Sequence, residues 1–437
     1  MLKAGAASVD ISPTDSQFLF GYPHVERYST GIHDPLLSSA LYLSDAQTAV
    51  LFIANDVIFV SKALVRRARE RIEKATGVSA SHIMITATHT HSGPKTVDYV
   101  SNDNDPIVPL ADRAYVQLLE DAIVAAAVEA CGNAQPALVG LGVADATGIG
   151  TNRRNPSGPA DPEVPVLMVR SATGGDSIAC MMVYSMHPTV LHEDSKLVSG
   201  DFPAMARRYL QLNAVGPQCP VLYHTGPAGN QSPRHVTRAN TFNEAERLGQ
   251  LLGRAAAKVI PEISYTSSVI LSSAQAFVDL PRRQLPCLLE AEENLARALQ
   301  KLEQLRTTNA KSQEIRTAEV DWFGAEETLT LARAAQEGRL DGSYRSCLPA
   351  EVQIIWVGSW VFVGWPGEIF VDHSLAVKAC RRNTFVISLA NGELQGYIVT
   401  EEAAGEGGYE ALNSLFGPQS GQMLVDKTLE LLNAPSR

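Results

Sequence analysis

The feature that most constrains the fold of this chain is a strand–helix–strand pattern near its amino terminus. An apolar, strand-like stretch at residues 41–56 is followed by the helical segment SKALVRRARERIEKATG at residues 61–77 and by a β-branched run at residues 83–88. Two strands joined by a helix form a β-α-β unit, whose sheet needs helices packed on its faces. The pattern therefore predicts an α/β protein.

The second predicted strand leads directly into the segment THTHSGP at residues 88–94. Side chains two positions apart on a strand project from the same face, so we expect His89 and His91 to point the same way. α/β folds place their chemistry at the carboxyl ends of strands. The pair could share one metal ion, or one histidine could bind the metal while the other contacts a substrate. Two structural histidines with satisfied hydrogen bonds are the alternative.

The remaining chain continues the alternation of strands and helices. Further strands are expected at residues 137–143, 164–170 and 177–186, and the composition changes to Glu, Ala, Leu, Lys and Arg between residues 285 and 340. We predict one α/β domain over residues 1–437, with mixed sheets, flanking helices and a helical hairpin inserted at residues 285–340. A solvated amphipathic cover is the main interpretation of the hairpin, and a role in dimerisation or as a lid is the alternative.

Charge and composition limit the kinds of partner that we expect for this protein. Lys plus Arg is 36 and Asp plus Glu is 47, which gives a net charge of −11 with no basic patch rich in aromatics, so we expect no nucleic acid. No apolar run reaches the ~20 residues of a membrane span and the amino terminus lacks a signal-peptide core, so we expect a cytoplasmic protein without integral membrane association. A homo-oligomer stays open. The six cysteines lie far apart without a C-x-x-C pair, which disfavours a thiolate zinc site or a disulfide framework.

A set of motifs points to a family. The segments THTHSGP, HPTVL, GNQSP, PGE and the GY…GGYE…FGP ending occur in this order, and together they resemble the catalytic domain of the neutral/alkaline ceramidase family over residues from about 3 to 425. The resemblance implies a ceramidase-like α/β fold and a zinc ion as cofactor. Matched motif by motif, it implies that the zinc is held by four residues: His89, His187, Glu368 and Tyr397. Imidazole and carboxylate ligands suit zinc, whose catalytic sites lower the pKa of bound water to about 7.

The same resemblance implies roles for five further residues. His91 would sit beside the metal, where it accepts a proton, polarises the substrate or only hydrogen-bonds to a ligand. Ser232 corresponds to a serine that is either a nucleophile or a group orienting water and substrate, and we favour orientation because zinc already activates water. Arg153 would hold the substrate carbonyl or a carboxylate, and Arg154 is the second choice for this role. Asn230 lies in the same loop as Ser232, as a substrate-binding candidate.

The departures from the family shape the functional hypothesis. Asn230 replaces the aspartate of the family's G-D-x-S-P loop, and we expect the chain to correspond to the catalytic domain without the carboxy-terminal immunoglobulin-like domain. No surface rich in exposed aromatics is apparent that would draw a lipid from a bilayer. We therefore expect a zinc-dependent hydrolase that cleaves an amide bond of a small N-acylated or other amide metabolite. The alternatives are an esterase or lactonase, a true ceramidase, and a metal-binding protein without catalysis.

Overall fold

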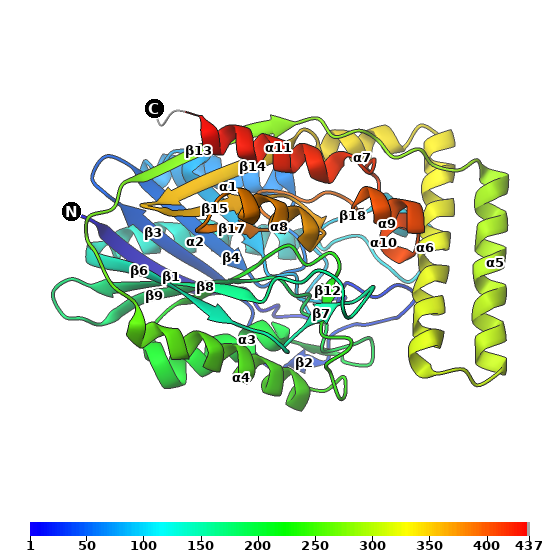
Figure 1. The fold of residues 1–437 in the computed structure, drawn as a ribbon, viewed down its shortest axis with the longest axis horizontal. Helices are drawn as coiled ribbons and strands as arrows, with labels where there is room; N and C mark the ends of the chain where they lie inside the picture. Colours follow the sequence, from blue (N-terminus) through cyan, green and yellow to red (C-terminus); the bar gives the residue numbers. More distant parts are fainter. Residues whose placement is uncertain (435–437) are drawn as a thin grey trace.

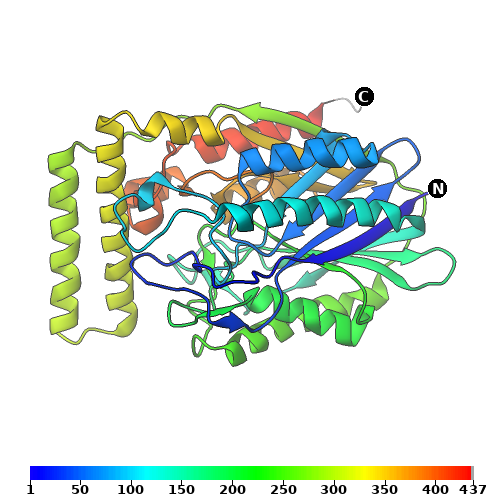
Figure 2. The ribbon, with the colours of Figure 1, turned by 180° about the vertical axis from the view of Figure 1, so that it is seen from behind.

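Two β-sheets packed face to face form the centre of the molecule, and helices cover the outer face of each sheet (Figure 1; Figure 2 shows the opposite side). The computed structural model describes residues 1–434, apart from the side chains of residues 312 and 313. This arrangement confirms the predicted α/β class with mixed sheets and flanking helices.

The larger sheet has eight strands and carries the predicted β-α-β unit at one edge. Its order is β11 (Val221–Thr225), β9 (Ser177–Tyr184), β8 (Glu163–Ser171), β6 (Gln135–Asp145), β1 (Lys3–Asp10), β3 (Leu37–Ser44), β4 (Ala49–Asn55) and β5 (Ile83–Ala87). Helix α1 (Lys62–Thr76) joins the parallel strands β4 and β5; Ser61 caps its start and Gly77, in the left-handed conformation, ends it. β9 and β11 are also parallel, and the other neighbours are antiparallel.

The smaller sheet lies against the inner face of the larger one. Its strands, in order, are β13 (Leu271–Val278), β14 (Ala350–Val357), β15 (Trp360–Gly364) and β17 (Thr384–Ile387), with β15 and β17 parallel. Buried apolar side chains from both sheets, such as Phe52 and Met84 of the larger and Phe362 and Phe385 of the smaller, form the core between them. Burial of this surface removes it from water, so the two sheets are held at a fixed separation.

Helices complete the outer layers. The larger sheet is covered by α1 and α2 (Arg113–Gly132) on one half and by α3 (Asp201–Leu210) and α4 (Phe242–Val259) on the other. The smaller sheet is covered by α7 (Leu340–Cys347), α8 (Val371–Cys380) and α11 (Ser420–Asn433). Among the described residues, no helix has the length and apolar character needed to cross a membrane.

The predicted hairpin is present as α5 (Leu288–Thr307) and α6 (Ser312–Gln336), which project from one end of the sandwich (Figure 1). α6 packs on the body of the protein, against the short helix α10 (Tyr409–Leu412) that follows α9 (Glu401–Glu406), and against the 3-10 turn at Val100–Asn102. α5 packs on the other side of α6. The hairpin is therefore part of the wall next to the loops at this end of the sheets, rather than a solvated cover alone.

Three short strand pairs lie in the loops at the ends of the main strands. They are β2 (Gly31–Ile32) with β10 (Leu197–Val198), β7 (Thr151–Asn152) with β12 (Gln231–Ser232), and β16 (Glu368–Ile369) with β18 (Tyr397–Ile398). Residues 388–391, just after β17, join the two edges of the larger sheet: Ser388 N–H donates to Thr225 O (2.8 Å) and Asn391 N–H to Ile85 O (2.7 Å). These hydrogen bonds bring the loops that follow β5, β11 and β17 close together, although they are far apart in the sequence.

Candidate metal centre and active site

The predicted metal ligands come from the ends of two strands of the larger sheet and from one of the short strand pairs. His89 and His91 follow β5, His187 follows β9, and Glu368 and Tyr397 open the paired strands β16 and β18, where they are register partners. One part of the prediction is wrong: β5 ends at Ala87, and His89 has φ +68°, so the two histidines do not share the face of a strand. A tight turn aims both imidazoles at the same point instead.

Four atoms that could bind a metal meet at this point. His89 Nε2 lies 3.1 Å from His187 Nε2 and 3.2 Å from Glu368 Oε2, and the last two atoms are 2.9 Å apart. His91 Nε2 is 3.4 Å from His89 Nε2. Ligand atoms bound tetrahedrally to zinc at ~2.0–2.1 Å lie about 3.3 Å from one another, so these separations fit a metal ion.

Backbone carbonyls fix the protonation of all three imidazoles. His89 Nδ1 lies 2.9 Å from Ile58 O, His187 Nδ1 lies 2.6 Å from Ala228 O, and His91 Nδ1 lies 3.1 Å from Gly21 O. A carbonyl oxygen only accepts hydrogen bonds, so each Nδ1 must donate its proton, and in the neutral ring each Nε2 carries a lone pair. Three such lone pairs and a carboxylate oxygen turned toward each other need a cation between them. The residues present therefore fit a divalent metal.

The charge states of the cluster favour the same conclusion. Burial lowers the pKa of His187 to about 4, and burial together with the charges of His89 and His187 places the pKa of His91 well below its usual value. Burial opposes ionisation of Glu368, but His89 and His187 hold its pKa well below the usual range. Neutral His187 and His91 beside an ionised Glu368 are protonation states that bind a metal.

Tyr397 lies next to the histidine cluster. Its ring centre is 6.5 Å from that of His187, and the Arg153 guanidinium stands 5.2 Å from its ring centre. Burial and the neighbouring Glu368 raise the pKa of the Tyr397 phenol. A cation in the cluster would oppose this rise, because positive charge favours the phenolate.

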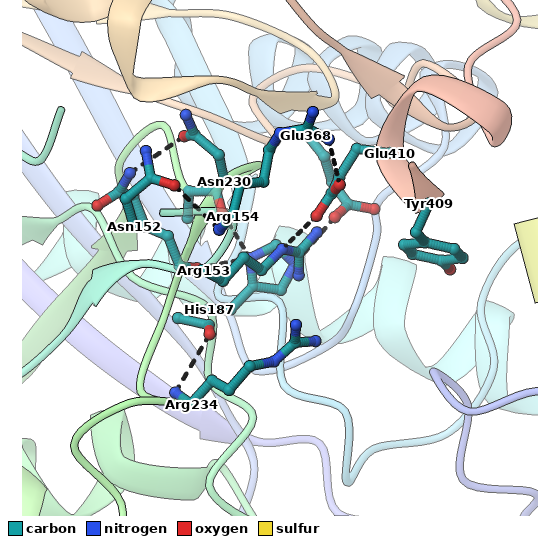
Figure 3. A network of polar contacts seen from close by, with 12 residues as sticks. Asn152, Arg153, Arg154, His187, Asn230, Arg234, Glu368, Tyr409 and Glu410 are labelled. Atoms are coloured by element: carbon teal, nitrogen blue, oxygen red, sulfur yellow. Dashed lines mark hydrogen bonds and ion pairs between the residues drawn. The ribbon is translucent and has the colours of Figure 1, made fainter. Parts of the chain in front are cut away.

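The two candidate arginines lie in different surroundings. Arg153 is buried; its Nε donates to Glu410 Oε1 (2.7 Å), and its Nη2 has no hydrogen-bond partner among the described residues. Arg154 turns to Glu410 Oε2 (3.0 Å), Glu406 and the carbonyl of Gly407, away from the cavities beside the histidines (Figure 3). Of the two, Arg153 reaches the cluster, where its side chain also interacts with Tyr397.

Ser232 and Asn230 are also placed differently. Ser232 lines a cavity; its Oγ accepts the Arg234 N–H (3.2 Å), and no side-chain base within the described part of the chain is hydrogen-bonded to it. Asn230 lines neither cavity: it donates to Asp372 Oδ2 (2.8 Å) and accepts from Val371 N–H (2.9 Å). Asn230 thus holds the loop that follows Glu368, and the structure does not bring it to a substrate position.

Two cavities adjoin the cluster and share His91, Tyr22, Tyr397 and Tyr409 in their walls. The first, which we call the apolar pocket, has an empty volume of about 570 Å³ including its mouth and is lined by His89, Glu368, Phe20, Phe59, Tyr99, Val108 and Glu327 among others. The second, the arginine pocket, has about 870 Å³ and is lined by Arg153, Ser232, Arg234, Arg316 and His192 among others. Both are of the size of small-molecule sites.

Several residues of these walls were missed from the sequence. Gly21 has φ +123° and its missing side chain leaves room for the His91 ring, since a Cβ there would overlap His91 Nδ1. Glu327 of α6 is buried, and burial and the neighbouring Glu326 raise its pKa to about 8. A glutamate on the inner side of a helix could have been recognised in the sequence as a candidate pocket residue. Nothing in the sequence distinguishes Arg234 or Arg316 from other arginines.

The sequence of the chain is similar to those of known proteins. Residues 2–219 match the model of the family described as neutral/alkaline non-lysosomal ceramidase, N-terminal. The chain belongs to the neutral/alkaline non-lysosomal ceramidase family. It is 23% identical over 313 residues to the neutral ceramidase of Pseudomonas aeruginosa, a match that covers 64% of this chain and 45% of that protein.

Solved structures show the same fold. The crystal structure of neutral ceramidase from Pseudomonas aeruginosa superposes with a TM-score of 0.76 at 20% identity, covering 100% of this chain and 75% of that one. A ceramidase complexed with C2 gives a TM-score of 0.74 at 18% identity and covers 99% of this chain and 75% of that one. The predicted ceramidase-like fold is confirmed.

Proposed function

We propose that this protein is a metal-dependent hydrolase that cleaves the amide bond of a small N-acylated metabolite, with zinc as the native metal. The observation that carries the proposal is the set of three imidazole Nε2 atoms and one Glu368 oxygen, each imidazole fixed by a backbone carbonyl. His89, His187, Glu368 and Tyr397 would hold the metal. When bound, zinc supplies Lewis-acid polarisation of a carbonyl and activation of a water molecule.

The residues around the cluster supply binding and proton transfer. His91 keeps a free lone pair on Nε2, because Gly21 O holds the proton on Nδ1, so it can accept a proton at the cluster. Arg153 offers its unpartnered Nη2 as a donor to an oxygen on which negative charge develops. Ser232 has a hydroxyl proton free to donate, because its Oγ already accepts from Arg234 N–H. We assign it to orienting the substrate rather than to attack.

True ceramidase activity is the second candidate, and the names of the relatives favour it. An esterase or lactonase differs only in the bond cleaved. A metal-binding protein without catalysis is a weaker candidate, since structural zinc sites fill all four positions with protein and are closed. Here two cavities reach the cluster through His91 and Tyr397.

The test is a hydrolysis screen with metal-loaded, chelated and reconstituted protein. The panel contains short N-acyl amides, the matching esters, and a short-chain ceramide. The proposal predicts that cleavage of small amides exceeds that of esters and ceramide, disappears on chelation and returns with zinc. Preferred cleavage of ceramide or of the esters would transfer the assignment to those alternatives, and activity that survives complete metal removal would refute the metal-dependent mechanism.

A further inference from the structure

The two pockets beside the histidine cluster differ in charge. In the apolar pocket the ionisable side chains apart from histidine and tyrosine are Glu327 and Glu368, and aromatic rings form much of the wall. In the arginine pocket the corresponding side chains are Arg153, Arg234 and Arg316, and no carboxylate lines it among the described residues. A molecule that spans the cluster therefore meets an apolar surface on one side and guanidinium groups on the other.

The three arginines are not equally balanced by carboxylates. Arg153 donates to Glu410 at 2.7 Å. Arg316 pairs with Glu319 at 2.7 Å and with Glu193 at 3.1 Å. The guanidinium of Arg234 has neither an ion pair nor a hydrogen bond within the part of the chain that the structure describes, and Arg234 is exposed. Of the three arginines, Arg234 is therefore the one without a direct carboxylate partner among the described residues.

The position of Arg234 places its charge in the wall of a cavity that His91 also lines. Arg234 comes two residues after Ser232, whose Oγ accepts its backbone N–H, and it lines the same cavity as Arg153 and His91. Partial desolvation and repulsion from Arg153 lower its pKa to about 10, so it remains charged at neutral pH. Thr189, Thr237 and Asn240 line the same pocket and offer further hydrogen bonds.

We propose that Arg234 binds a carboxylate of the substrate, so that the substrates are amides with an apolar group on one side of the scissile bond and a carboxylate on the other. N-acyl amino acids belong to this class. A guanidinium presents paired N–H donors that match the two oxygens of a carboxylate, and the other two arginines keep the surroundings positive. This inference rests on the proposed function for the position of the scissile bond, whereas the carboxylate contact can be measured by binding alone.

The test uses substrates that differ only in the anionic group. N-hexanoylglycine and N-hexylsuccinamic acid place a carboxylate on the amine side and on the acyl side of the amide, and their primary carboxamide counterparts are neutral. Binding to the metal-loaded protein is measured by calorimetry, and hydrolysis by release of hexanoate or hexylamine. For at least one pair we expect the carboxylate to bind about tenfold to a hundredfold more tightly than the carboxamide, the range for a hydrogen-bonded charge.

Variants assign this preference to one side chain. Arg234→Gln should bring the two members of the pair to within about twofold, and Arg234→Lys should keep part of the preference because it keeps the charge. Arg238→Gln is the matched control, since Arg238 is exposed on the same loop and does not line the pocket. The preference should be unchanged there.

The failure of this inference differs from that of the proposed function. If neither pair shows a preference for the carboxylate, or if the preference survives in Arg234→Gln, the carboxylate assignment is overturned even when all four amides are hydrolysed. If no amide is hydrolysed but carboxylate binding is lost in Arg234→Gln, the contact stands and the proposed reaction falls.

Discussion

The candidate active site has two halves that are built in different ways. The strand-end half consists of His89, His91 and His187, which follow strands β5 and β9 of the larger sheet, and of Glu368 in the short strand β16. Each imidazole is fixed by a backbone carbonyl. The wall half consists of loops and the inserted helix α6, with Arg234, Arg316 and Glu327 among its ionisable side chains. In the wall half, Arg316 and Glu327 contact other side chains, and the Arg234 guanidinium has no partner among the described residues. The first half is suited to fix a metal, and the second to select a substrate.

Loss of a strand-end imidazole should have the largest effect. His187→Ala removes one lone pair and leaves Glu368 facing a gap, so we expect loss of the metal and at least a 10³-fold fall in kcat/KM. Mass spectrometry measures the metal content, and hydrolysis of the best amide substrate gives kcat/KM. His192→Ala, in the wall of the arginine pocket, serves as the control and should keep the metal. Full metal content in His187→Ala would remove His187 from the ligand set.

Arg153 and Arg154 provide a matched pair at the boundary of the two halves. Both bind Glu410, but only Arg153 has a free donor in the cavity wall. Arg153→Gln should lower kcat by about 10²–10³-fold, the usual loss for one donor to a developing oxyanion, with a smaller change in KM. Arg154→Gln should change kcat less than tenfold. Equal losses of kcat in the two variants would indicate that both act only by holding Glu410.

Gly21→Ala tests whether His91 is a ligand or a neighbour of the metal. The new Cβ would overlap the His91 ring, so the imidazole must shift, and a shift of about 1 Å costs on the order of 10²-fold in rate. We expect kcat to fall about 10–100-fold while metal content stays at the wild-type level. Gly175→Ala controls for backbone strain, since Gly175 has φ +74° and open space around its Cβ position. Loss of metal in Gly21→Ala alone would make His91 a ligand.

Glu327→Gln should have the smallest effect, visible in the pH dependence of stability. The pKa of Glu327 is about 8 in the folded protein against an ordinary value of 4.5. The folded state therefore binds more protons between these values, and stability falls as pH rises through this window, by at most about 1.4 kcal/mol per pH unit. Urea unfolding of wild type and variant at pH 5, 6, 7 and 8 should show a weaker fall in the variant. An identical pH dependence of the free energy of unfolding in wild type and variant would contradict the assignment of Glu327 as buried and protonated.

The two halves also differ in how far the sequence predicts them. The β-α-β unit, the hairpin and the ligand-bearing loops follow from apolar periodicity and from short motifs that keep their order, because each depends on nearby residues. The face shared by His89 and His91 was predicted from strand pleating, whereas the structure uses a turn with positive φ at His89. The interactions that occupy Asn230 and Arg154 come from residues more than a hundred positions away, so their placement outside the cavities could not be read from local patterns.

The central claim is that the strand-end half holds a catalytic metal, and the most direct test is metal content measured together with activity. The purified protein should contain about one zinc ion per chain, lose it together with amide hydrolysis on chelation, and recover both when zinc is returned; His89→Ala should contain none. An active wild-type protein free of metal would contradict the account and leave Ser232 as the leading nucleophile.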